Sequence, residues 1–174
     1  MAASKIAFDF NESKAIETIL YLANRISRSY KYNICKMLYL ADKASLEKYG
    51  RFIFGESYSA MKEGATPSKS YDLLKEVAEE CTDDLCVEGN AIVALRDANL
   101  DYLSESDIEC LDQTIAVYDK NPQKMYDDAH DDAWERAWEN KGGKRSADIP
   151  VRNIAKTLAN PKDLIDYLTN RSVE

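Results

Sequence analysis

The chain has 174 residues, of which 45% are hydrophobic and 31% are charged, and this balance is typical of one globular domain spanning residues 1–174. Asp and Glu number 31 against 23 Lys and Arg, so the formal net charge is -8 at pH 7. This sign is opposite to that of proteins that bind nucleic acid by neutralising phosphates, so we do not expect nucleic acid as a direct partner.

The first predicted helix follows Asn11, whose side chain can cap backbone N–H groups, and it extends to about Tyr30 because apolar residues recur at three-to-four spacing. A second helix is predicted from Asn33 to Gly50, since glycine suits the left-handed position after a helix. The second helix carries one apolar stripe, formed by Ile34, Met37, Leu38 and Ala41. We expect the two helices to pack as a hairpin.

The residues between 51 and 67 combine aromatic side chains with glycines, and this pattern predicts extended structure and turns. Pro67 suits the first turn of a third helix, predicted from Ser68 to about Cys81. The inward face of this helix is predicted to hold Tyr71, Leu74, Val77 and Ala78. A short hairpin is predicted over residues 85–95 around a Glu88-Gly89-Asn90 turn, with Leu100 and Tyr102 extending it.

A capping box is predicted at Ser104 and Asp107, where it opens a helix that runs to Tyr118. After Pro122 an acidic run from Asp127 to Asp132 leads into another helix, which ends at a glycine pair. The apolar residues of that helix are Trp134, Ala137 and Trp138.

Two final helices are predicted to begin at Pro150 and Pro161, because proline is favoured in the first turn of a helix. Together the elements predict a mainly α fold, a compact helical domain with a small antiparallel β-sheet or hairpin. This content places the chain with the all-α proteins.

Four cysteines occur in the chain together with a single histidine. The closest pair, Cys81 and Cys86, has no second pair beside it, so the spacing does not indicate a zinc site. No apolar run approaches the roughly 18 residues of a membrane span, and the first residues lack the apolar core of a secretory signal. We therefore expect a cytoplasmic protein with reduced thiols and no membrane partner.

Negative charge is concentrated between residues 83 and 119, where ten Asp and Glu residues accompany one basic residue, Arg96. This concentration predicts an acidic face. The face is either a solvated surface or an electrostatic landing site for a basic protein partner, and both interpretations stay open.

The acidic run around His130 is the best candidate for catalysis or metal binding, because carboxylates and imidazole can ligate a divalent ion or move protons. Asp131 and Asp132 also lie where a helix begins, and carboxylates there cap N–H groups. We favour this structural role, with His130 hydrogen-bonded. The alternative is a small metal-dependent hydrolase that uses Asp127, Asp128, His130 and Asp131.

Motifs for other chemistry are missing from the sequence. Neither Gly-x-Ser-x-Gly, a P-loop nor Gly-x-Gly-x-x-Gly occurs. The missing motifs argue against a serine hydrolase and a nucleotide-dependent enzyme, so we expect no enzymatic activity and no catalytic residues.

Several motifs occur in a fixed order along the chain: the run Lys36 to Lys43, Tyr49-Gly50-Arg51, Gly55, Tyr58, Ala60-Met61-Lys62, Gly64, Pro67-Ser68, Tyr71 to Lys75 and Ala129 to Trp134. Together these motifs resemble the Panacea domain, the family that includes the SocA-like antitoxins of bacterial and phage toxin–antitoxin pairs. The similarity extends over about residues 15–140.

The resemblance implies a mainly helical fold with a small antiparallel sheet, no cofactor, and direct binding of a cognate protein toxin. It also implies an alternative function, in which the chain is a proteolytic adaptor that delivers its bound toxin to an ATP-dependent protease. The end from Asn170 to Glu174 is the segment that such an adaptor would offer to the protease. Whether the chain forms a homo-oligomer stays open.

Tyrosine is favoured at protein interfaces because it combines an apolar face with a hydroxyl group, and the chain has eleven. Tyr58 lies in the glycine-bearing segment and is our first candidate for an interface, with simple packing as the alternative. The full set of predicted partner-binding residues is Tyr58, Met61, Lys62, Gly64, Pro67, His130 and Trp134. On this hypothesis Tyr58→Ala and Lys62→Glu weaken protection against the toxin and leave the fold intact.

Overall fold

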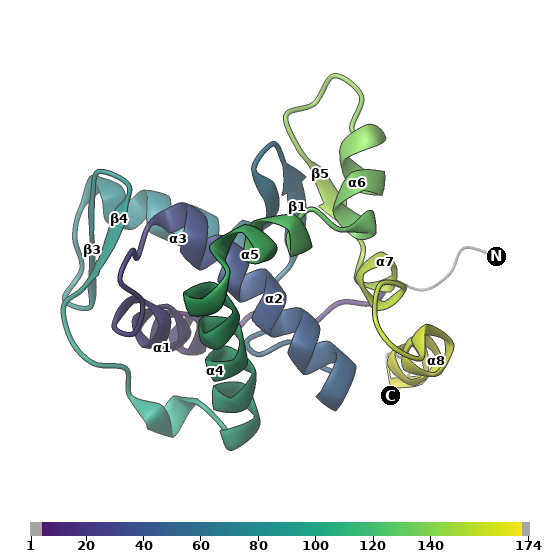
Figure 1. Ribbon diagram of the computed structural model, residues 1–174, viewed down its shortest axis with the longest axis horizontal. Coiled ribbons are helices and arrows are strands. Elements are labelled where there is room, and N and C mark those ends of the chain that lie inside the picture. Colours follow the sequence, from purple (N-terminus) through teal and green to yellow (C-terminus); the bar gives the residue numbers. More distant parts are fainter. Residues whose placement is uncertain (1–4, 172–174) are drawn as a thin grey trace.

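The computed structural model describes residues 5–171 and is mainly helical, with short antiparallel strands between the helices (Figure 1). The predicted mainly α fold is therefore confirmed, but the two β-sheets show that the chain is not all-α. In chain order the elements are α1 (Glu12–Ala23), α2 (Lys31–Tyr49), β1 (Tyr58–Met61), β2 (Gly64–Pro67), α3 (Ser68–Glu79), β3 (Leu85–Glu88), β4 (Ala91–Ala94), the 3-10 helix η1 (Leu100–Tyr102), α4 (Glu105–Lys120), α5 (Pro122–Asp128), α6 (Asp132–Glu139), β5 (Ala147–Ile149), α7 (Val151–Ala155) and α8 (Pro161–Arg171).

Three predicted helix boundaries, each marked by a capping side chain or a terminal glycine, are confirmed. The Asn11 side chain accepts from Lys14 N, and Ser104 and Asp107 form both bonds of a capping box at the start of α4. Helix α2 ends at Gly50, which has a φ of 70°. The two starts were predicted because a side chain satisfies backbone groups that the helix leaves unpaired, and the end at Gly50 was predicted because glycine suits the left-handed position.

The end of α1 was predicted wrongly. The helix stops at Ala23, well before Tyr30, and the Asn24 side chain donates to the carbonyl oxygens of Leu20 and Arg96, both at 3.0 Å. Ile26 is buried although it lies outside the helix, so its apolar character continued the periodic pattern without continuing the helix. The predicted inward face of the third helix is also wrong in part, because Tyr71 is only half-buried and Ala78 is exposed.

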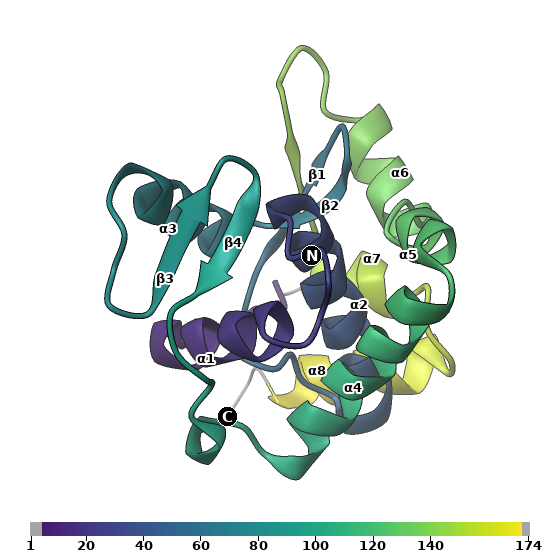
Figure 2. The ribbon, with the colours of Figure 1, turned by 60° about the vertical axis from the view of Figure 1, so that its left-hand side comes forward.

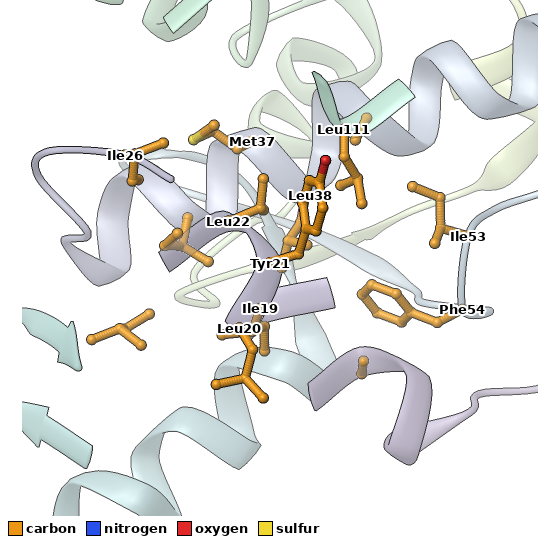
Figure 3. Close-up of a cluster of buried hydrophobic side chains, with 14 of the residues drawn as sticks. Ile19, Leu20, Tyr21, Leu22, Ile26, Met37, Leu38, Ile53, Phe54 and Leu111 are labelled. Atoms are coloured by element: carbon orange, nitrogen blue, oxygen red, sulfur yellow. The ribbon is translucent and has the colours of Figure 1, made fainter. Parts of the chain in front are cut away.

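Helix α2 runs through the centre of the molecule, with α1 and α4 packed against it and α7 nearby on another side (Figures 1 and 2). One apolar cluster joins α1, α2 and α4, and Figure 3 shows Leu22, Leu38 and Leu111 meeting in it. A second cluster contains Tyr39 and Tyr58 together with residues of the C-terminal helices. Since α2 contributes to both clusters, polar residues on α2 are enclosed together with its apolar stripe.

The strands form two antiparallel sheets. Strand β1 is the middle strand of the first sheet, in the order β2-β1-β5, and Tyr58 lies opposite both Pro67 and Ile149. The predicted hairpin is β3–β4, whose turn contains Gly89 with a φ of 63°. Strand β5 was not predicted, and Leu100 to Tyr102 form η1 and do not extend the hairpin.

The expectation of four reduced thiols is wrong for one pair. Cys81 and Cys86 form a disulfide across a Cα separation of 4.5 Å. The chain leaving α3 turns back at once, since Thr82 N donates to the carbonyl oxygen of Leu85 at 2.9 Å. This turn returns Cys86 beside Cys81, whereas Cys35 and Cys110 are buried free thiols.

Among residues 5–171 there is no helix with the length and apolar character needed to cross a membrane. The proposed protease-directed end lies partly outside the described residues. Asn170 and Arg171 close α8, and residues 172–174 are not described.

Candidate protein-binding site

Five aromatic rings follow one another along the start of α2, α5, the turn between α5 and α6, and α6, and we call them the aromatic row. Its members are Tyr32, Tyr126, His130, Trp134 and Trp138. Successive ring centroids are 6.3, 4.3, 4.6 and 5.6 Å apart. Four of the rings are spaced four residues apart in the sequence, a spacing that places side chains on one face of a helical path. That spacing was the available signal for the row, although we did not predict the row from it.

The turn between β1 and β2 packs against this row. Trp134 Nε1 donates to the carbonyl oxygen of Met61 at 2.8 Å, and Ala65 N donates to that of Ala129 at 3.1 Å. Gly64 has a φ of 118°, and a Cβ there would lie 3.1 Å from His130 Cε1. The structure thus brings together Met61, Gly64, His130 and Trp134, with Lys62 exposed at the turn.

Tyr58 and Pro67 lie away from this turn, at the other end of the β1–β2 pair. The Tyr58 side chain is only 2% exposed, its ring packs against Tyr39 and Phe52, and its hydroxyl donates to Asp42. The expectation that Tyr58 is a surface contact is therefore wrong, because strand alternation turns it toward α2. Tyr58→Ala would remove core packing, so it cannot test a surface.

Acidic residues of the run around His130 form hydrogen bonds and ion pairs within the fold. Asp131 accepts from Trp134 N at 2.9 Å, which confirms its predicted role at a helix start, and it also accepts from Tyr39 and Lys43. Asp128 pairs with the Lys124 ammonium group at 2.6 Å. Across the part of the chain that the structure describes, no group of three or more His, Cys, Asp and Glu residues is arranged to hold a metal ion.

His130 is hydrogen-bonded, as predicted, through one ring nitrogen. Its Nδ1 lies 2.9 Å from the carbonyl oxygen of Tyr126, whereas Nε2 is buried with no hydrogen-bond partner among residues 5–171. The ring therefore packs as a member of the aromatic row, between Tyr126 and Trp134.

The acidic segment from 83 to 119 is partly neutralised within the chain. Asp107 pairs with Lys14 and Arg51, and Arg96 pairs with both Glu17 and Asp84. The hydrogen bond from Arg96 lowers the pKa of Glu17 below its usual value, although burial opposes this shift. Glu109 pairs with Lys48. The exposed acids of this segment that form no ion pair within residues 5–171 are Asp83, Glu88, Asp97, Asp101, Glu105, Asp112 and Asp119.

A pocket of about 430 Å³ opens beside the aromatic row and the β1–β2 turn. We call it the Lys36 pocket, and its walls include Tyr30, Tyr32, Lys36, Met61, Lys62 and Tyr71. Its volume is within the range of sites that hold small molecules or a few residues of a peptide.

Lys36 is an unusual group for a pocket wall, because its side chain is only 2% exposed. The ammonium nitrogen lies 2.6 Å from the centroid of the Tyr32 ring and 5.2 Å from that of Tyr126. Within residues 5–171 it takes part in no hydrogen bond or ion pair. Burial lowers the pKa of Lys36 to about 7, and the nearby Cys35 and Glu63 oppose the shift only in part.

Lys36→Met is expected to raise the free energy of unfolding at pH 7 by about 2 kcal/mol, because Met fills a similar volume without a buried charge. The unfolded chain holds the Lys36 proton up to its ordinary pKa of 10.5, whereas the folded chain releases it near 7. The wild-type protein should therefore gain stability between these two pH values, and the advantage of Lys36→Met should shrink. Urea unfolding at pH 7 and pH 10 measures both effects, and Lys162→Met on α8 is the exposed control. A destabilised Lys36→Met protein would contradict the prediction.

Comparison with known proteins identifies the family of the chain. No curated protein and no solved structure matches it significantly. The model of the family described as Antitoxin SocA-like, Panacea domain, matches residues 34–135. This range contains the β1–β2 turn, Lys36 and the three central rings of the aromatic row. Because the match covers more than half of the sequence, the chain belongs to the SocA-like antitoxin family with a Panacea domain.

Proposed function

We propose that this chain is an antitoxin that neutralises a cognate protein toxin by direct binding, and that it binds through one continuous face. The face consists of the aromatic row, the β1–β2 turn and the Lys36 pocket. The observation that carries the proposal is the partial exposure of the row, in which Tyr32 and Tyr126 are 38% and 36% exposed.

The chemistry of the face supports protein binding. Tyrosine and tryptophan dominate the energetics of protein interfaces, because each buries a large rigid surface and still offers a hydrogen-bonding group. The turn adds an exposed cation, Lys62, beside the rings. A partner could therefore cover the rings while its polar groups meet the turn.

The first experiment is co-expression of the chain with the product of the adjacent small open reading frame, with growth and co-purification as the measurements. Rescue of growth together with a stable complex supports the proposal and identifies the toxin. Absence of toxicity in that product moves the test to the other neighbouring gene, and the proposal fails if neither neighbour is toxic and bound.

Tyr126→Ala is then expected to weaken the complex about 30-fold, which is typical of losing an interface tyrosine. Lys62→Glu should weaken it as well, because the charge at the turn reverses. Tyr102→Ala is the matched control, since Tyr102 is 48% exposed on η1, outside the proposed face. Circular dichroism and melting temperature check that all three variants fold. Unchanged affinity in both Tyr126→Ala and Lys62→Glu would overturn the proposed face.

Toxin lifetime distinguishes masking from delivery to a protease. Masking predicts that the toxin persists in cells whose growth has been restored. Loss of the toxin only in the presence of the antitoxin would contradict simple masking and favour the adaptor function.

A further inference from the structure

The charge of the Lys36 pocket is opposite to that of the whole protein. The residues described around it include the cations Lys31, Lys36 and Lys62 against one acid, Glu63. Neither Lys31 nor Lys62 forms an ion pair among residues 5–171. The chain as a whole has a net charge of -8, so the pocket is a local positive site in a negative molecule.

The position of Lys36 leaves its ammonium group without the acceptors that a buried cation normally has. The Tyr32 ring lies against it, at 2.6 Å from nitrogen to centroid, but a ring face gives less stabilisation than a carboxylate. An anion that entered the pocket would form both an ion pair and a hydrogen bond with this group, in surroundings that exclude much of the water. Such an anion would supply the acceptor that no described residue supplies to this ammonium group.

The walls favour one kind of anion. Tyr30, Met61 and Tyr71 are among the lining residues, so aromatic and apolar residue types surround the pocket. No arginine is among the residues described around the pocket, and one ammonium group is buried there. A carboxylate carries a single charge that matches this single buried cation, whereas a phosphate dianion needs more donors to offset its loss of water.

We infer that the Lys36 pocket binds an acidic side chain of the toxin, presented on a segment with an adjacent apolar or aromatic residue. This inference rests on the proposed function, since it names the chemistry that the binding face recognises. The carboxylate pairs with Lys36, and the apolar neighbour packs against the tyrosine rings at the mouth. The negative charge of the rest of the surface disfavours acidic segments that lack this apolar neighbour, so recognition requires both parts.

The first test uses a small probe and does not depend on the toxin. 4-Phenylbutyrate carries a carboxylate on an aromatic stem, and 4-phenylbutyramide has the same shape without the charge. Titration followed by NMR of the lysine ε-CH₂ groups is expected to show that the acid shifts the Lys36 signal and binds about 10-fold more tightly than the amide. Lys36→Met should abolish the preference for the acid, whereas Lys162→Met, on α8, should retain it. Equal binding of acid and amide, or tighter binding of inorganic phosphate, would overturn the inference.

The second test uses the toxin identified by co-expression. Lys36→Met is expected to weaken the complex about 30-fold, and one Asp→Asn or Glu→Gln variant of the toxin should weaken it by a similar factor. Combining the two changes should cost little more than either alone, because both remove the same ion pair. Additive losses would contradict the pairing.

The two tests separate the inference from the proposed function. If the face variants weaken the complex but Lys36→Met does not, the binding face is retained and the acidic anchor is wrong. If 4-phenylbutyrate binds at Lys36 but the face variants leave toxin affinity unchanged, the pocket chemistry is supported and the proposed toxin-binding face fails.

Discussion

Glu56→Gln is expected to lower the free energy of unfolding by about 3 kcal/mol, although Gln has almost the same shape as Glu. Glu56 is 2% exposed and accepts hydrogen bonds from donors on all sides. Its Oε1 accepts from Ser57 N at 2.9 Å and Lys69 N at 3.0 Å, and its Oε2 accepts from the backbone N of Ser70 at 2.9 Å and from its hydroxyl at 2.7 Å. However the Gln amide is turned, its NH₂ group faces at least one backbone N–H.

The cost is large because Glu56 supplies the cap that α3 lacks in its own sequence. Pro67 stands at the N-cap position and makes no side-chain bond there. The carboxylate binds the first N–H groups of the helix, where its negative charge is also favoured by the helix dipole. Urea unfolding followed by circular dichroism measures the loss, and Glu79→Gln, exposed near the end of the same helix, is the control. A Glu56→Gln protein within about 0.5 kcal/mol of wild type would contradict this account.

Asp42→Ala is expected to cost about 4 kcal/mol, whereas Asp42→Asn should leave stability at pH 7 unchanged or slightly higher. Asp42 is 1% exposed, and its two oxygens accept from Ile53 N at 2.7 Å and from the Tyr58 hydroxyl at 2.6 Å. Asn can keep both bonds, because its oxygen accepts from Ile53 and its NH₂ donates to the Tyr58 oxygen. Ala leaves both groups unpaired and creates a cavity.

The pH dependence follows from the same burial, which raises the pKa of Asp42 to about 7 even though the bonds from Ile53 and Tyr58 lower it. Between about pH 4 and pH 7 the folded protein holds a proton on Asp42 that the unfolded chain has released. The contribution of Asp42 to stability therefore falls as the pH rises through this range and is constant above it. Asp42→Asn lacks this dependence, so its stability relative to wild type should rise from pH 4 to pH 8. Tyr58→Phe should cost about 1 kcal/mol as a control for one bond. An Asn variant as unstable as the Ala variant would disprove the bonding scheme.

Glu56 and Asp42 show why part of the fold could not be predicted from the sequence. Asn11, Gly50 and Ser104 act on residues next to them, so their roles are visible in a short window. Glu56 caps a helix that begins at Ser68, and Asp42 bonds to a strand and a loop. Charged residues are expected in solvent, and only the tertiary structure shows that these are enclosed.

The sequence also predicted only part of the candidate site. His130, Trp134, Met61 and Gly64 were selected on motifs that resemble a family, and the structure brings them together at one turn. Lys36 lies within another of those motifs, but the periodic interpretation of its helix assigned burial to one stripe alone. Helix α2 contacts neighbours on several sides, so a lysine outside the stripe is buried as well. Hydrophobic periodicity identifies the buried face of a helix whose other face is exposed to solvent. The middle of α2 has little solvent-exposed surface, so the pattern could not show all of its buried residues.

The fold requires residues that lie outside the range matched by the family model, and strand β5 is one example. The matched residues end at 135, whereas β1 in the centre of its sheet is paired on one side by Ala147 to Ile149. At the other end, α1 precedes residue 34 and supplies Ile19, Leu20 and Leu22, each fully buried, to the core. A fragment trimmed to the matched residues would expose a bare strand edge and an uncovered apolar core, two features that promote aggregation. The range matched by the family model is therefore smaller than the unit that packs the core and completes the sheet.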